Sequence, residues 1–229
     1  MNNITASEVN KLRKATGAGI MDCKNALVES NGDFDLAIEN LRKKGQKVAA
    51  KRADRESSEG AVIATVNNTN DCGIIISLNC ETDFVGKNES FVSLAKEISE
   101  IALECDNLDQ LFNSSFDDTM SVKEKLTEQT GVIGEKIEIG SFVKIKSNFV
   151  GSYIHAGNKI ATLVGLSESF EGCGEVAKNI AMQAAAMNPI ALDEDGVSKE
   201  LIEKEIEIAK EQLRSEGKPE NMLENIAKG

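Results

Sequence analysis

Histidine and cysteine are the side chains with the clearest capacity for acid-base chemistry and metal binding near neutral pH. This 229-residue sequence has one histidine, His155, and five cysteines: Cys23, Cys72, Cys80, Cys105 and Cys173. The cysteines are odd in number, widely spaced and without the close pairs of a zinc site, so we expect reduced thiols and no metal site. His155 ends an apolar strand pattern and has no nucleophile beside it, which favours a packed or capping histidine over a general base.

Sequence motifs of known catalytic chemistry are missing. We find no Gly-rich dinucleotide fingerprint after a strand, no His-Glu-x-x-His, no Gly-x-Ser-x-Gly and no EF-hand spacing. The glycine pair in "TGAG" follows a helical pattern and lacks the Lys-Ser/Thr ending of a phosphate-binding loop, so it indicates an interhelical turn. We therefore expect no enzyme activity and no cofactor.

The stretch "NCETDFVGKNESF", residues 79–91, is unusual for a connection. It lies between a strand-like run, "GIIISL", and a helical pattern, "FVSLAKEISEIALE", yet it contains Phe84 and Val85. Connections lie on the surface and often carry function. Two interpretations stay open: Phe84 folds back into the core, or it is offered to a partner.

Composition and charge restrict the function classes. The chain is 41% hydrophobic and has a net charge of -12, whereas residues 1–55 carry eleven Lys/Arg against seven Asp/Glu. So acidic a protein is poorly suited to extended phosphate-backbone contacts, and the basic connector at residues 43–60 has no aromatic side chain to stack on bases, so we expect no stable nucleic-acid binding. No apolar run has a membrane-spanning length of about 20 residues, and the first residues lack a signal-like apolar block, so we expect a cytoplasmic protein without membrane contact.

Helical patterns dominate the first part of the sequence. Thr5 and Glu8 have capping-box spacing before an apolar stripe, and Gly17 and Gly19 are suited to the positive φ values of a tight turn. The pattern predicts a small bundle of helices at residues 6–15, 21–30 and 34–44. The polar residues 43–60 then predict a connector that is partly helical.

Period-two patterns follow the connector. We expect an antiparallel hairpin of residues 61–66 and 73–78, and helices at residues 89–104 and 121–131. Three further strands are predicted in residues 136–147, 150–157 and 159–167, with a small-residue helix at 173–188 that stops before Pro189. Strand pairs followed by helices, twice over, indicate two related α+β halves.

The last part has a narrow apolar stripe among charges. It predicts a long amphipathic helix at residues 197–218 and a second helix that opens at Pro219. Two helices of this kind pack against a partner protein or against each other.

Four blocks of this sequence resemble bacterial elongation factor Ts, the nucleotide exchange factor for elongation factor Tu. They are residues 12–27, 31–45, 82–85 and 151–164. The resemblance implies an α+β fold with a ubiquitin-associated-like three-helix domain, a two-subdomain core with antiparallel sheets and a protruding helical hairpin. The implied domain ranges are 1–54, 55–148, 149–188 and 189–229.

The resemblance also implies sites for elongation factor Tu, GDP-bound or nucleotide-free. Phe84 would wedge near the Mg²⁺ and P-loop of the partner while Asp83 helps to hold that arrangement, within the block Thr82, Asp83, Phe84 and Val85. The three-helix domain would contact the partner through Leu12, Arg13, Ile20 and Met21. A second core surface would consist of Tyr153, His155 and Gly157.

Two departures from the family pattern bear on these expectations. Gly86 stands where the resemblance implies alanine, which would loosen the wedge slightly. The resemblance allows a homodimer through the core or hairpin. The chain ends at Gly229, inside the implied second arm of the hairpin, and this affects both that dimer and the affinity for elongation factor Tu. A passive adaptor that binds a protein through the three-helix domain is the alternative function.

Overall fold

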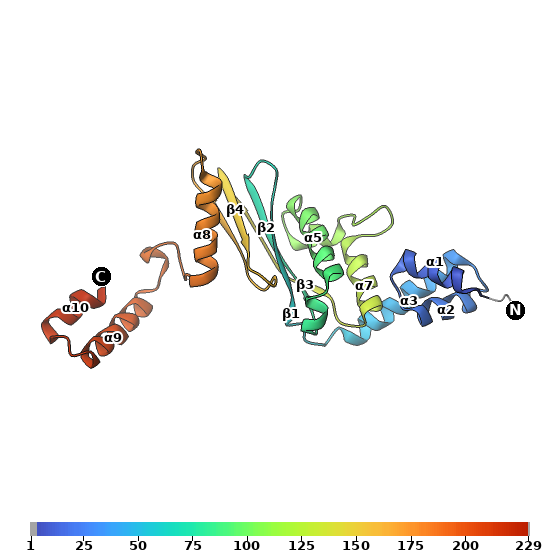
Figure 1. Cartoon of the computed structure of the whole chain (residues 1–229), viewed down its shortest axis with the longest axis horizontal. Coiled ribbons are helices and arrows are strands. Elements are labelled where there is room, and N and C mark those ends of the chain that lie inside the picture. Colours follow the sequence, from blue (N-terminus) through green and yellow to red (C-terminus); the bar gives the residue numbers. More distant parts are fainter. Residues whose placement is uncertain (1–3, 229) are drawn as a thin grey trace. The chain divides into compact units, whose positions relative to one another are not determined.

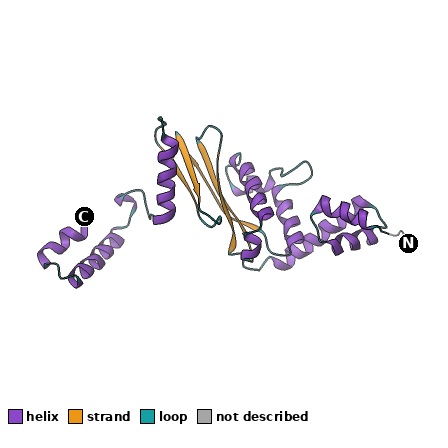
Figure 2. Ribbon diagram, in the orientation of Figure 1, coloured by secondary structure: helices purple, strands orange, loops and turns teal. Residues whose placement is uncertain are grey.

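The computed structural model describes residues 4–228 and contains helices and antiparallel sheets (Figure 2). The predicted α+β class is confirmed. The chain divides into two compact units, Met1–Ala185 and Ala186–Gly229. The four functional domains expected from the sequence stay a prediction.

The first unit begins with three short helices that enclose a small core of their own. They are α1 (Ala6–Thr16), α2 (Ile20–Glu29) and α3 (Phe34–Arg52). The predicted capping box of Thr5 and Glu8 is confirmed, and Gly17 ends α1 with a φ of 68°. Gly19 has a φ of -60° and is the N-cap of α2, so the expectation of a positive φ there is wrong.

Helix α3 is longer than its apolar pattern indicates. It continues through the basic residues 43–52, so the first half of the predicted connector is helical. Its glycine, Gly45, is buried against α7 (Val122–Ile133). A Cβ built on Gly131 of α7 would lie only 2.4 Å from the Cα of Gly45, so the two backbones approach closely because neither residue has a side chain.

Five strands in residues 4–228 form two antiparallel sheets. The predicted hairpin is confirmed as β1 (Glu59–Val66) and β2 (Cys72–Cys80), and β3 (Glu138–Lys146) joins it in the order β1-β2-β3. The strands β4 (Phe149–Ile154) and β5 (Ala161–Leu166) form the second sheet.

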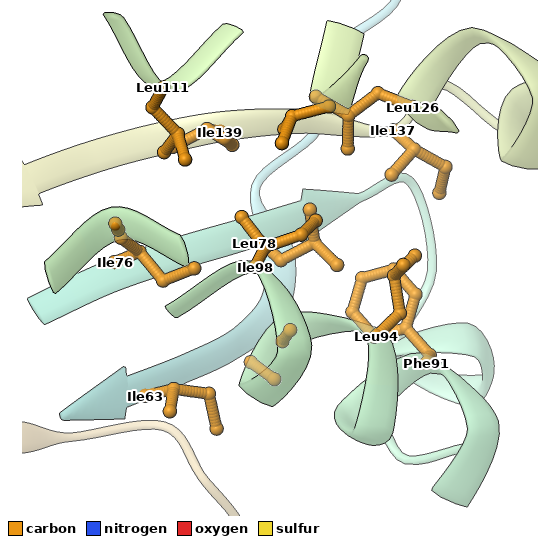
Figure 3. Packing of buried hydrophobic residues seen from close by; sticks show 14 of the residues in the cluster. Ile63, Ile76, Leu78, Phe91, Leu94, Ile98, Leu111, Leu126, Ile137 and Ile139 are labelled. Carbon is orange, nitrogen blue, oxygen red and sulfur yellow. The ribbon is translucent and has the colours of Figure 1, made fainter. Parts of the chain in front are cut away.

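Helices cover these sheets and bury the apolar side of the strands. Helix α5 (Glu89–Leu103) packs on β1 and β2, and α6 (Leu108–Asn113) and α7 continue the layer. Figure 3 shows Phe91, Leu94 and Ile98 of α5 against Ile76 and Leu78 of β2. This arrangement buries large apolar side chains, the main favourable contribution to folding.

Helix α8 (Cys173–Met187) lies beside the β4-β5 sheet (Figure 1). Its buried positions are four residues apart, at Cys173, Ala177 and Ala181. Gly151 of β4 allows the close approach, since a Cβ there would lie 2.5 Å from the Cβ of Ala177. The hydroxyl of Thr162 donates to the carbonyl of Ala181 at 2.7 Å and ties the helix to β5.

The second unit contains a short 3-10 helix, Glu194–Gly196, followed by α9 (Lys199–Ser215) and α10 (Glu220–Lys228). Both predicted helices are confirmed, and they pack on each other. Leu223 is only 1% exposed, and Lys210 forms an ion pair with Glu224 at 2.5 Å. Within the described residues, no helix combines the length and apolar character that crossing a membrane requires.

Candidate functional site: an exposed aromatic on a short braced helix

Phe84 lies on the surface, which decides between the two interpretations of its loop. It belongs to a four-residue helix, α4 (Asp83–Gly86), and its side chain is 84% exposed. A Phe this exposed contributes little to folding and leaves its apolar ring in water. Phe84 is therefore available to a partner rather than part of the core.

Asp83 stands beside Phe84 in an ion pair of its own. Its carboxylate accepts from the ammonium of Lys87 at 2.6 Å. This hydrogen bond and the charge of Lys87 lower the pKa of Asp83 below its ordinary value. Phe84 thus lies next to a partly exposed carboxylate that is paired with Lys87.

The opposite side of α4 is anchored in the core. Val85 packs against the main apolar cluster, and Gly86 is buried. A Cβ on Gly86 would lie 3.1 to 3.2 Å from backbone atoms of Gly60 in β1, so alanine would require a small shift of either segment. The glycine therefore allows α4 to lie close to β1, and its geometry gives no support to the expected loosening of the wedge.

The end of β4 and the turn that leads to β5 carry the second predicted group. The hydroxyl of Tyr153 lies 2.9 Å from Nδ1 of His155, and both His155 and Gly157 are exposed. Gly157 has a φ of 89°, a conformation that favours glycine. The backbone N–H of Val62 donates to the carbonyl of Asn158 at 2.8 Å and attaches this turn to β1.

These two groups lie near each other, on either side of the start of β1. Lys159 of the turn pairs with Glu59, one residue before the Gly60 that contacts α4. After the hydrogen bond and charge of Lys87, the charge of Lys159 also lowers the pKa of Asp83. Residues more than 70 positions apart in the sequence, Asp83 and His155, thus belong to one region of the first unit.

The predicted residues of the three-helix domain are divided between its surface and its core. Ile20 is 51% exposed and Met21 is 62% exposed at the start of α2, and Arg13 is exposed on α1. Leu12 is fully buried among the three helices, so its predicted role as a contact residue is wrong. It stabilises the helix that presents Arg13.

Several residues that shape this site were missed by sequence reasoning. Glu135 and Arg52 bind the segment before α4, and Gly60 contacts Gly86 at the end of α4. Their partners are distant in the sequence, so no local pattern identifies them. Val28, 55% exposed on α2, lies seven residues after Met21 and extends the apolar face of that helix, which the spacing alone could have indicated.

The described part of the chain, residues 4–228, contains no group of three or more His, Cys, Asp or Glu side chains placed to hold a metal ion. All five cysteines are free and buried. The site consists instead of exposed apolar side chains, one carboxylate and an exposed histidine on rigid supports. Exposed Phe, Met and Arg side chains of this kind are enriched in surfaces that bind another protein.

The fold and the site thus define an α+β protein with a helical N-terminal domain and exposed apolar side chains on its surface. The family profile described as "Elongation factor TS" matches residues 81–229. Elongation factor Ts from Christiangramia forsetii is 66% identical over 229 residues, which is 100% of this chain and 83% of that relative. Its counterpart from Flavobacterium psychrophilum is 64% identical with the same coverage, and that from Amoebophilus asiaticus is 50% identical over 232 residues, covering 99% of this chain and 82% of the relative. The chain belongs to the elongation factor Ts family of translation elongation factors.

Proposed function

We propose that this chain is a guanine nucleotide exchange factor that binds elongation factor Tu in the cytoplasm and promotes GDP release. Phe84 and Asp83 act near the Mg²⁺ and P-loop of the partner, and the factor binds both the GDP-bound and the nucleotide-free form. The observation that carries the proposal is the 84% exposure of Phe84 on a helix whose other side is anchored in the core. No covalent step and no cofactor are required of the factor.

The physical basis is the concentration of charge around a bound nucleotide. In a GTPase, backbone N–H groups at a helix N-terminus bind the phosphates and Mg²⁺ bridges phosphate to protein. A small displacement of either one weakens several charge-assisted hydrogen bonds together. An inserted aromatic ring is therefore a suitable means of releasing GDP.

The magnitude requires more than one contact. A ten-thousandfold faster release corresponds to a barrier lower by about 5.5 kcal/mol. Burial of one Phe supplies about 1.5 to 3 kcal/mol. The remainder falls to two other groups of side chains. One is Arg13, Ile20 and Met21 on the helical domain, and the other is Tyr153 near the end of β4 with His155 and Gly157 on the turn after it. Because coupling between sites is reciprocal, the bound nucleotide weakens the factor's affinity to the same extent.

Release of a fluorescent GDP analogue from elongation factor Tu, with Mg²⁺ present, tests the proposal. We expect fast release with the unsubstituted chain and a large loss with Phe84→Ala. Phe170→Ala is the matched control, because Phe170 is also exposed, at 50%, but lies before α8. Equal release rates with all three proteins would contradict the role of Phe84.

The passive adaptor is the second candidate, and the exposure of Ile20 and Met21 favours it. In that case the helical domain binds a protein partner and the core only holds it. Ile20→Ser with Met21→Ser would then abolish binding, while Phe84→Ala would change neither binding nor nucleotide release. Slower GDP release with Phe84→Ala at saturating concentration would exclude the adaptor.

A further inference from the structure

Glu135 is bonded to the segment that leads into α4. One oxygen of its carboxylate accepts from the backbone N–H groups of Glu81, at 3.1 Å, and Thr82, at 3.0 Å. The other oxygen accepts from the Thr82 hydroxyl at 2.7 Å. One side chain therefore fixes two backbone groups and one side chain of a segment more than 50 residues away.

The chain holds Glu135 firmly in this position. Helix α7 ends at Gly134, which has a φ of 81° and donates its N–H to the carbonyl of Thr130 at 2.9 Å. On the other side of Glu135, the N–H of Ile137 donates to the hydroxyl of the buried Thr130 at 3.2 Å. The backbone on both sides of Glu135 is thus fixed by hydrogen bonds to Thr130 of α7.

Helix α4 requires such support. A single helical turn is unstable by itself, because few hydrogen bonds offset the order imposed on its backbone. Its N-cap residue, Thr82, makes no side-chain capping bond. The Thr82 hydroxyl is bound to Glu135 instead, so the beginning of α4 is fixed from outside the helix.

A second set of contacts fixes the residue before Thr82. One guanidinium nitrogen of Arg52, the last residue of α3, donates to both carboxylate oxygens of Glu81, at 2.7 and 2.8 Å. The N–H of Lys136 donates to the same carboxylate at 2.7 Å. The entrance of the Phe84 loop is therefore held by α3 and by the segment between α7 and β3.

We propose that Glu135 is a positioning residue for Phe84, in an inference that rests on the proposed exchange function. The carboxylate orders residues 81–82 before any partner is present, so the ring of Phe84 projects in a defined direction. A side chain that is ordered in advance loses less freedom on binding and binds more strongly. Glu135 touches neither the partner nor the nucleotide in this role.

The absence of tryptophan from the sequence provides a direct readout. In Phe84→Trp the only indole reports the motion of position 84 through its time-resolved anisotropy, without elongation factor Tu. We expect Glu135→Ala in this background to give faster and wider local motion, and Glu135→Gln, which keeps one acceptor oxygen, an intermediate effect. Glu100→Ala is the matched control, because Glu100 is exposed on α5 and the substitution removes the same charge.

The same variants with Phe84 retained are then compared in GDP release. We expect Glu135→Ala to weaken exchange by roughly threefold to tenfold, which corresponds to ordering one or two side chains on binding. The loss should be larger at low factor concentration than at saturation, because the cost of ordering residues 81–82 mainly weakens the affinity for elongation factor Tu.

The results separate the two proposals. Unchanged anisotropy in both folded Glu135 variants would overturn the positioning role, whatever happens to exchange. If Glu135→Ala does not fold, Glu135→Gln decides the question by the same measurement. If Glu135→Ala increases the motion at position 84 but the unsubstituted chain promotes no GDP release from elongation factor Tu, the positioning of Phe84 is supported and the exchange function is contradicted.

Discussion

Gly131 of α7 lies against Gly45 of α3 with so little space that a Cβ on Gly131 would come within 2.4 Å of the Gly45 Cα. The reverse is different: a Cβ on Gly45 would meet its nearest neighbour, the carbonyl oxygen of Thr127, at 3.5 Å, an ordinary contact. The helix that completes the N-terminal bundle thus packs closely on α7 at one asymmetric glycine pair.

Gly131→Ala should therefore destabilise the first unit, whereas Gly45→Ala should not. Overpacking of this kind costs about 1 to 3 kcal/mol, and the atom in the way belongs to the backbone and cannot rotate aside. Alanine at Gly45 fits and favours the helix by about 0.5 to 1 kcal/mol. Urea unfolding of both variants measures the difference, and equal stabilities would contradict the tight α3-α7 contact.

Phe84 and Phe91, seven residues apart, should respond in opposite ways to truncation. Phe84 is 84% exposed, so Phe84→Ala should change the free energy of unfolding by no more than about 0.5 kcal/mol. Phe91 is 2% exposed in the main core, and Phe91→Ala should cost about 3 to 5 kcal/mol. Thermal or denaturant unfolding of the two variants makes this comparison. A large loss of stability with Phe84→Ala would place its ring in the core.

Local sequence signals predicted the secondary structure well. The capping box of Thr5 with Glu8 needs only a spacing of three residues, and the structure contains it. The alternating apolar pattern located β1 and β2 because one side of each strand is buried. Helix α3 is longer than predicted because its second half packs on α7 through Gly45. Glycine has no apolar side chain, so the sequence pattern does not indicate this contact.

The position of the site could be predicted from the sequence, whereas the contacts that hold it in place could not. The unusual Phe84 was visible in the sequence, but its exposure depends on how Val85 and Gly86 seat the opposite side of α4. Leu12 was assigned to the surface although its place in the apolar stripe of α1 buries it. Glu135 lies 53 residues from Thr82, so only the folded chain brings them together.

The contact between Arg52 and Glu81 should make stability depend on pH in the acid range. The N–H of Lys136, followed by the guanidinium of Arg52, lowers the pKa of Glu81 below its ordinary value of 4.5. A carboxylate with a lowered pKa in the folded state contributes stability that is present above its ordinary pKa and is lost as the pH falls through the lowered one. We expect wild type to exceed Glu81→Gln in unfolding free energy at pH 7 and the difference to shrink progressively below about pH 4.5. Urea unfolding of both proteins across this range measures it, and a constant difference would disprove the titration of Glu81.

The cysteines should resist modification while the chain is folded, because thiolates react and thiols do not. All five are buried, and burial, followed by the negative charge of Glu135, raises the pKa of Cys80 to about 11. At pH 8 only about one Cys80 in a thousand is then ionised.

A disulfide reagent added to the native protein at pH 8 should react slowly, at a rate set by opening of the fold, and five thiols should appear at once in concentrated guanidinium chloride. Because Glu135→Gln weakens the hydrogen bonds that hold Glu81 and Thr82, it should make the segment between β2 and α4 open more often and speed the labelling of Cys80 relative to Glu100→Ala. Rapid labelling of Cys80 in the unsubstituted native protein would show that the segment between β2 and α4 opens freely, which the hydrogen bonds of Glu135 should prevent.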